Sequence, residues 1–214
     1  MALENNEKFD LKVVQDNFST ALCEEDDVQL QSYLNSYEEL NKFFTLMGTV
    51  FGFVSKDLKS KMEILAEFLA NEKTSDNFTT VKKMIEYERD NQLLHKKGYT
   101  SGSRTLLRLH RGLDFIREFL KNVGELKDEE NTGAVCRDAY DRTLAKHHPF
   151  MIRKGAQIAM YTLPTREQLL KRVCGDEASV REALETLPKT LDATDAVYMR
   201  IEALYTQYDL HALP

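Results

Sequence analysis

Two pairs of charged residues have a spacing that lets them act together. Asp57 and Lys61 are four residues apart, and so are Arg104 and Arg108. Side chains at this spacing share one face of a helix, with their Cβ atoms about 5–6 Å apart. A carboxylate beside an ammonium forms an ion pair, whereas two guanidinium groups together hold an anion such as a phosphate. Each pair therefore has two interpretations, a solvated surface stripe or part of a binding site.

The surroundings of the two arginines favour an external anion over a solvated stripe. Arg108 stands between Leu107 and Leu109, which predicts that its side chain is partly buried. A buried guanidinium needs an anionic partner. Arg104 comes early in its predicted helix, where the positive end of the helix dipole disfavours a cation unless an anion is near.

His147 and His148 precede Pro149 and an apolar triplet at 150–152. Adjacent histidines do not project to one point and no metal-type spacing accompanies them, so we predict no metal site. His148 either caps the helix that Pro149 opens or presents a neutral donor and acceptor at the mouth of a pocket. The triplet either packs in the core or, with Arg153 and Lys154 after it, dips into a lipid headgroup region.

Motifs of the common enzyme classes are missing from the sequence. It has no nucleophile elbow, no P-loop, no Gly-x-Gly-x-x-Gly and no His-Glu-x-x-His. Asp57 and His148 are an acid and a base, but nothing in the sequence brings a nucleophile to them. We therefore predict no catalytic residue, no cofactor and no enzymatic activity.

Helical spacing of apolar residues runs through almost the whole chain. We expect helices over residues 9–22, 30–70, 78–97, 104–123, 134–145, 149–161, 166–173 and 177–208. A helix over 30–70 would be about 60 Å long, so Gly48 and Gly52 within it predict either a break or a close approach of a neighbour. Pro188 predicts a bend or a split in the last helix. The sequence predicts one all-α domain over residues 1–214 with about eight helices.

Two segments, 62–65 and 106–109, have wider apolar faces than a surface helix needs. They either fill a thick core between two helical layers or line a cavity between them. Because apolar side chains line both, the sequence leaves both interpretations open.

Composition narrows the class of protein. The 214 residues include 29 Lys and Arg against 35 Asp and Glu, a net charge of −6, which argues against a general nucleic-acid binder. No window approaches about 18 uninterrupted apolar residues, so we expect no membrane span. The first seven residues lack the features of a secretory signal, and three cysteines without metal-type spacing indicate reduced thiols. We expect a cytosolic protein.

The order of these motifs resembles the glycolipid transfer protein superfamily, and within it the branch that transfers ceramide-1-phosphate. The segments that carry the likeness are 54–61, 104–111, 148–149 and 163–167, and it extends over essentially the whole chain. The resemblance implies a two-layer helical sandwich that encloses an apolar lipid pocket. It also implies a headgroup site on the surface and shuttling between membranes without catalysis.

Carried over residue by residue, the resemblance implies a headgroup site made of Asp57, Lys61, Arg104, Arg108 and His148. Asp57 would accept hydrogen bonds from the ceramide amide and hydroxyl, and His148 would meet the carbonyl oxygen of the amide region. The three cations would hold the phosphate. The implied partners are ceramide-1-phosphate and, transiently, intracellular membranes, with the protein a monomer.

Charge favours a phosphate over a sugar in this site. Three cations and one carboxylate leave a net charge of +2, and a phosphomonoester carries about −1.5 to −2 at neutral pH. An uncharged sugar would leave desolvated cations without a counter-ion. Sugar-binding members of the superfamily place a Trp under the sugar, and this chain has no Trp. A carrier or sensor of glycosphingolipids or of other phosphosphingolipids stays the alternative, and a lipid hydrolase using Asp57 and His148 is less favoured.

The residue after His148 and Pro149 differs from that of many relatives. Phe150 stands where they often have Trp, so the resemblance does not determine how strongly this chain docks on a membrane.

Overall fold

The structure is a computed structural model, which describes residues 8–24 and 26–214. The predicted absence of a signal in the first seven residues therefore lies outside the described part. Within it the chain forms nine α-helices: α1 Leu11–Ala21, α2 Leu30–Leu46, α3 Gly52–Ala70, α4 Val81–Asp90, α5 Gly102–Glu125, α6 Thr132–Arg142, α7 Phe150–Tyr161, α8 Arg166–Cys174 and α9 Glu177–Gln207. Three short 3₁₀ helices link them: η1 Thr49–Phe51, η2 Ser75–Phe78 and η3 Ala145–His147. The all-α prediction is confirmed.

Local sequence determines where six of the helices begin. A side-chain oxygen just before the helix accepts a backbone N–H from the first turn in each case. These residues are Asp10, Thr80, Ser101, Asn131, Thr165 and Asp176, before α1, α4, α5, α6, α8 and α9. Each such cap contributes about 1 kcal/mol, because it satisfies a donor that the helix itself leaves free.

The predicted break in the 30–70 segment is confirmed and lies at Gly48. Helix α2 ends at Leu46, and α3 begins at Gly52 after the single turn η1. Gly48 has φ 120° and ψ 168°, a conformation that essentially only glycine adopts. Arg172 of α8 donates from Nη1 to the carbonyl oxygen of Met47 at 3.1 Å, which satisfies the end of α2.

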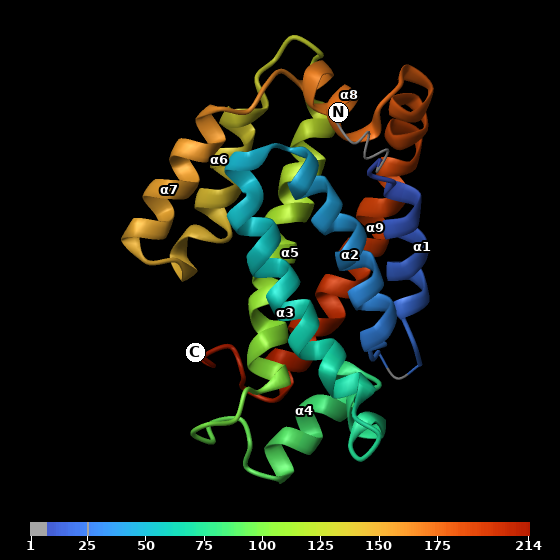
Figure 1. Cartoon of the computed structure of the whole chain (residues 1–214). Coiled ribbons are helices and arrows are strands. Elements are labelled where there is room, and N and C mark those ends of the chain that lie inside the picture. The colour runs from blue at the N-terminus through green and yellow to red at the C-terminus, as the bar shows by residue number, and fades with distance from the viewer. Residues whose placement is uncertain (1–7, 25) are drawn as a thin grey trace, which may run out of the picture.

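The helices form the two layers that the resemblance implied (Figure 1). Consecutive helices α1, α2 and α3 pack side by side in one layer, and α9, α5 and α6 pack side by side in the other. The layers meet where α1 packs on α9 and α3 packs on α5, and α7 packs on the outer side of α6. Residues that α3 and α5 present to each other therefore lie between the layers.

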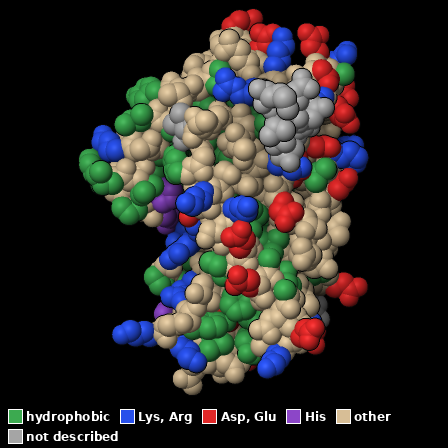
Figure 2. Space-filling model, in the orientation of Figure 1, with side chains coloured by type: hydrophobic (Ala, Val, Ile, Leu, Met, Phe, Trp, Pro, Cys, Tyr) green, Lys and Arg blue, Asp and Glu red, His purple; other side chains and the backbone are tan. Residues whose placement is uncertain are grey.

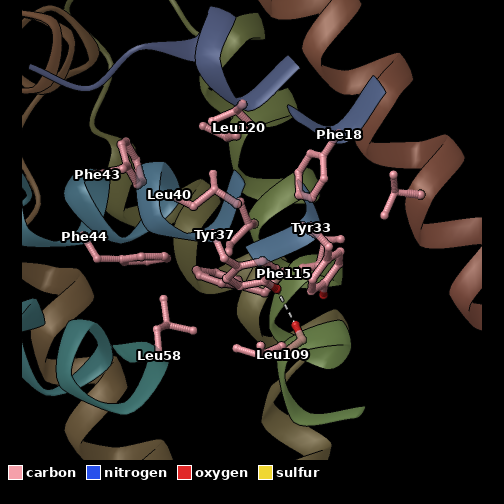
Figure 3. Close-up of a cluster of buried hydrophobic side chains, with 14 of the residues drawn as sticks. Phe18, Tyr33, Tyr37, Leu40, Phe43, Phe44, Leu58, Leu109, Phe115 and Leu120 are labelled. Atoms are coloured by element: carbon pink, nitrogen blue, oxygen red, sulfur yellow. Dashed lines mark hydrogen bonds between the residues drawn. The ribbon is translucent and has the colours of Figure 1, made fainter. Parts of the chain in front are cut away.

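Aromatic side chains of α2 fill much of the space between the layers (Figure 3). Tyr33 and Tyr37 are fully buried, and their ring centroids are 5.0 Å apart. The Tyr37 hydroxyl donates to the carbonyl oxygen of Leu109 in α5, shown as a dashed line in Figure 3. Burial of such rings is worth about 1.5–3 kcal/mol each. The two layers are thus joined by packing and by a specific hydrogen bond.

One predicted helix boundary was wrong, and one of two alternatives for the last helix is excluded. Helix α4 ends at Asp90, not at 97, because the following Gln92 has φ 56°, which interrupts a right-handed helix. The last helix is not split, since α9 continues through Pro188. Leu187 and Leu191 on either side of Pro188 pack against the core, and this packing offsets the lost backbone bond.

In the described part of the chain, no helix combines the length and apolar content that crossing a bilayer requires.

Candidate functional site

A cavity of about 610 Å³ lies between the layers. Its apolar wall comes from α2, α3, α5 and α7, from the turns between helices and from the last residue: Phe44, Phe51, Phe53, Val54, Leu58, Gly112, Phe115, Ile116, Leu144, Ile152, Ala156, Ala159, Met160 and Pro214. Its polar residues are Asp57, Lys61, Arg108, Arg111, Tyr140, His147 and His148. A volume of this size with few polar groups is typical of a ligand pocket.

The leucines of the two wide apolar segments belong to the core and do not line this cavity. Leu65, Leu106 and Leu109 have no exposed surface and pack within the main hydrophobic cluster. Of the two interpretations, core filling is therefore correct for these segments. The cavity is lined instead by residues one helical turn away, such as Leu58 of α3 and Phe115 of α5.

Asp57 and Lys61 form the predicted ion pair on α3. The Asp57 side chain is 65% exposed and the Lys61 side chain only 14% exposed. An ion pair that water reaches on one side is worth at most about 1 kcal/mol. The carboxylate is therefore free to exchange this partner for a ligand donor at little cost.

Arg108 lies on the cavity wall but is exposed, so the expectation of partial burial was wrong. The neighbouring leucines face the core, and Arg108 lies on the opposite side of α5 from them. Its Nη2 donates to the carbonyl oxygen of Pro214 at 3.4 Å. This bond is long, which leaves most of the guanidinium donors available.

Arg111 is a cavity residue that the sequence analysis missed. It lies three positions after Arg108 on α5, a spacing that puts both side chains on one face, and this spacing is the signal that was available. Its Nη2 donates to the carbonyl oxygen of His211 at 2.9 Å. Burial, with a smaller contribution from the Arg108 cation, lowers the pKa of the Arg111 guanidinium. An anion between the two arginines would relieve both effects.

Arg104 is one turn before Arg108 but does not line the cavity. Its Nη2 donates to the carbonyl oxygen of Tyr99 at 2.6 Å, and its Nε atom is buried with no hydrogen-bond partner among the described residues. The structure thus brings four of the five predicted residues to the cavity and leaves Arg104 beside it.

Glu88 explains why the helix-dipole argument for an anion at Arg104 does not hold. Its buried carboxylate accepts bonds from the Ser101 hydroxyl at 2.7 Å and from the backbone N–H groups of Gly102 and Ser103 at 2.6 and 2.9 Å. The start of α5 therefore has an anion within the protein itself.

His148 does not cap α7, because Pro149 precedes that helix without a side-chain cap. Its Nδ1 atom lies 2.8 Å from the hydroxyl of Tyr140. Burial lowers the pKa of His148, the Lys61 cation lowers it further, and the Asp57 carboxylate opposes both. His148 is therefore a neutral group at the cavity, with one ring nitrogen bonded to Tyr140.

The charges around the cavity sum to a positive site. Lys61, Arg108 and Arg111 against Asp57 leave a net charge of +2. His147, which also lines the cavity, has a pKa lowered by burial and then by the Arg111 cation. A dianionic group would bring this cluster close to neutrality.

The apolar triplet at 150–152 is exposed, so the core interpretation of it was wrong. Phe150, Met151 and Ile152 are 60%, 77% and 46% exposed. Two further residues of α7, Ile158 and Tyr161, are 67% and 71% exposed. Figure 2 shows these apolar side chains gathered over α7, next to a histidine and several Lys and Arg side chains. Ile152 also lines the cavity, so this apolar face adjoins the cavity.

Within residues 8–24 and 26–214, no three His, Cys, Asp or Glu side chains gather where they would hold a metal ion.

Comparison with known proteins gives consistent matches over most of the chain. A family model described as glycolipid transfer protein matches residues 28–175. A ceramide-1-phosphate transfer protein of Danio rerio is 39% identical over 212 residues, which are 96% of this chain and 98% of that protein. The protein of the same name from Homo sapiens is 34% identical over 210 residues, 96% of this chain and 97% of its own.

Solved structures of ceramide-1-phosphate transfer proteins also match this chain over nearly its whole length. The apo-form of mouse ceramide-1-phosphate transfer protein superposes with a TM-score of 0.89 at 32% identity, over 96% of this chain and 100% of that one. The human protein in complex with 12:0 ceramide-1-phosphate gives a TM-score of 0.86 at 33% identity, over 96% and 100% of the two chains.

Proposed function

Because this chain belongs to the glycolipid transfer protein family, we propose that it carries ceramide-1-phosphate between membranes without catalysing a reaction. Membership of the family and the likeness to its ceramide-1-phosphate branch confirm the prediction from the motifs. The observation that carries the proposal is the positive cluster at the edge of an apolar cavity. An apolar cavity suits hydrocarbon chains, and the charges suit the phosphate.

In the proposed mechanism, the lipid tails move from the apolar interior of a bilayer into the apolar cavity of the protein. A chain of 16 carbons disfavours water by roughly 13 kcal/mol, at about 0.8 kcal/mol per CH₂. The cavity lets the tails leave a bilayer without crossing water. The phosphate then accepts hydrogen bonds from Lys61, Arg108 and Arg111, with Arg104 one turn away. Asp57 accepts from the amide N–H and the hydroxyl of the lipid.

Contact with the membrane is assigned to α7. Its exposed residues Phe150, Met151 and Ile158 form an apolar face, and Lys154 lies over the Phe150 ring with its Nζ atom 5.6 Å from the centroid. An apolar helix face edged by cations is suited to the interface of an anionic bilayer. The protein would dock there as a monomer, from the cytosol, with the cavity turned toward the lipid.

A transfer assay with defined vesicles tests the proposal. Donor vesicles carry labelled ceramide-1-phosphate or labelled galactosylceramide, and we expect rapid transfer of the first alone. Arg108→Leu should abolish transfer while its circular dichroism spectrum stays native. Arg181→Leu is the matched control, because Arg181 is exposed on α9 away from the cavity, and it should transfer normally.

Three outcomes would contradict the proposal. Near-native transfer by Arg108→Leu would refute the phosphate site. Preference for galactosylceramide would favour the glycosphingolipid alternative. Mass spectrometry of the lipid after incubation should find it intact, and a dephosphorylated or cleaved product would favour the hydrolase alternative.

A further inference from the structure

Tyr140 bonds the histidine of the proposed headgroup site. Tyr140 belongs to α6 and is only 2% exposed, and its hydroxyl lies 2.8 Å from His148 Nδ1. Its ring meets Phe115 edge-on, with centroids 6.2 Å apart. The side chains of Tyr140, His148 and Phe115 all line the cavity. The phenol ring is therefore held in place by packing against α5, the neighbouring helix in the same layer.

Both partners of this bond are neutral near pH 7. Burial raises the pKa of the Tyr140 phenol, so it keeps its proton. Burial lowers the pKa of His148, and the Lys61 cation acts in the same direction. A neutral imidazole has one nitrogen that donates and one that accepts, and the bond to Tyr140 determines which is which.

The direction of the bond follows from what surrounds the phenol. Among the described residues, His148 Nδ1 is the hydrogen-bond partner of the Tyr140 hydroxyl. If Nδ1 carried the proton, it would donate to the phenol oxygen, and the phenol proton would then point at hydrocarbon once lipid fills the cavity. An unsatisfied buried donor costs about 1–3 kcal/mol. The phenol therefore donates to Nδ1.

We propose that Tyr140 is a positioning residue, whose hydroxyl holds His148 in the tautomer protonated at Nε2 so that this N–H donates to the carbonyl oxygen of the lipid amide. This inference rests on the proposed function. Asp57 then accepts a hydrogen bond from the amide N–H, while His148 donates one to the carbonyl oxygen of the same amide. The site thus binds both polar groups of one amide. Without the Tyr140 hydroxyl, the imidazole is free to turn or to change its tautomer. In the other tautomer Nε2 carries no proton, so it cannot donate to the carbonyl oxygen of the lipid amide.

Nitrogen NMR of the lipid-loaded protein tests the tautomer directly. The ¹⁵N signals of His148 are assigned by their loss in His148→Gln, with ceramide-1-phosphate bound to the native protein. We expect an unprotonated Nδ1 and a protonated Nε2. A protonated Nδ1 would overturn the inference.

Transfer rates test whether Tyr140 acts through His148. Tyr140→Phe should slow ceramide-1-phosphate transfer about threefold to tenfold, the effect of losing one neutral hydrogen bond. In a His148→Gln background the same change should cost nothing further. Tyr208→Phe is the matched control, since its hydroxyl bonds Glu86 at 2.6 Å outside the cavity, and it should transfer at the native rate.

The outcomes separate this inference from the proposed function. Equal losses from Tyr140→Phe in both backgrounds would make Tyr140 a purely structural residue. Native transfer by Tyr140→Phe, with His148→Gln impaired, would overturn the inference and leave the carrier intact. Native transfer by His148→Gln would overturn the role of His148 in the headgroup site and the inference with it.

Discussion

Arg111 connects the cavity to the C-terminal segment through a single side chain. It lines the cavity and donates to the carbonyl oxygen of His211. Arg108, one turn before it, bonds the carbonyl oxygen of Pro214. The neutral carbonyl oxygen of His211 is a weaker partner for a guanidinium than a phosphate group, because the phosphate adds its own charge and offers two oxygens to one guanidinium. A lipid phosphate therefore has an advantage over the segment for the same donors.

Arg111→Leu should weaken binding of ceramide-1-phosphate about tenfold and change binding of uncharged ceramide less than twofold. The reason is the loss of hydrogen bonds to a charged group, worth about 1.5–3 kcal/mol. Fluorescence titration with the two lipids measures both. Arg111→Lys keeps the charge and should retain most of the affinity. Equal losses for both lipids would mean that Arg111 only holds the C-terminal segment.

The break between α2 and α3 depends on one backbone conformation. Gly48 has φ 120°, and residues on either side of the break, Phe44 and Phe51, line the cavity. The direction in which α3 leaves the turn therefore determines where Asp57 and Lys61 stand.

Gly48→Ala should lower the free energy of unfolding by about 1–3 kcal/mol, because a side chain makes this conformation unfavourable. Gly52→Ala is the matched control. Gly52 has φ −58°, and a Cβ added there would meet nothing within 4 Å, so stability should stay the same or rise slightly. Urea denaturation of the two variants measures the difference. Equal stability of both would contradict the assignment of strain to Gly48.

Helix α7 has two apolar sides, of which one is buried at the cavity and the other is exposed. Ala156, Ala159 and Met160 are buried and line the cavity, whereas Met151 and Ile158 are exposed. The rest of the described chain leaves this exposed side largely uncovered, which supports the proposed contact of α7 with a membrane.

The double substitution Met151→Glu and Ile158→Glu should slow transfer at least tenfold, because each buried apolar side chain contributes about 1.5–3 kcal/mol to membrane binding. Binding of a short-chain, water-soluble ceramide-1-phosphate should not change. Met199→Glu is the control, since Met199 is 61% exposed on α9, and its transfer rate should stay native. Vesicle flotation measures docking, and unchanged flotation of the double variant would remove α7 from the interface.

Three histidines with lowered pKa values link the stability of the whole molecule to pH. Burial is the main cause that lowers the pKa of His110, of His147 and of His148. Each then binds a proton more weakly in the folded chain than in the unfolded chain, where the pKa is about 6.5. The unfolded state therefore takes up more protons as the pH falls through 6.5, and folding becomes less favourable.

We expect the melting temperature to fall between pH 7.5 and pH 5.5, a range above that in which most carboxyl groups titrate. His110→Asn should make the melting temperature less dependent on pH, because His110 is 2% exposed and its loss removes one of the linked groups. Calorimetry at three pH values measures this, and a melting temperature that rises on acidification would contradict it.

Most of the fold was predictable because its signals are local. Apolar spacing predicted the helices, and the glycines at 48 and 52 predicted the break between α2 and α3. The end of α4 was wrongly predicted, because the backbone of Gln92 adopts φ 56° and interrupts the helix there. At Pro188 the sequence left a bend or a split open, and the helix is continuous because core packing holds both sides of it.

The sequence by itself determined the residue types of the site and their neighbours along a helix, since spacings of three and four are properties of one helix. It thus identified two charged pairs, Asp57 with Lys61 and Arg104 with Arg108, and indicated His148 as a candidate. Only the tertiary structure decided that α3, α5 and the turn before α7 enclose one cavity, that Arg104 stays outside its lining while Arg111 belongs to it, and that Tyr140 holds His148. The cavity brings together residues from Phe44 to Pro214, and the packing of the helices against one another, which no local pattern encodes, creates it.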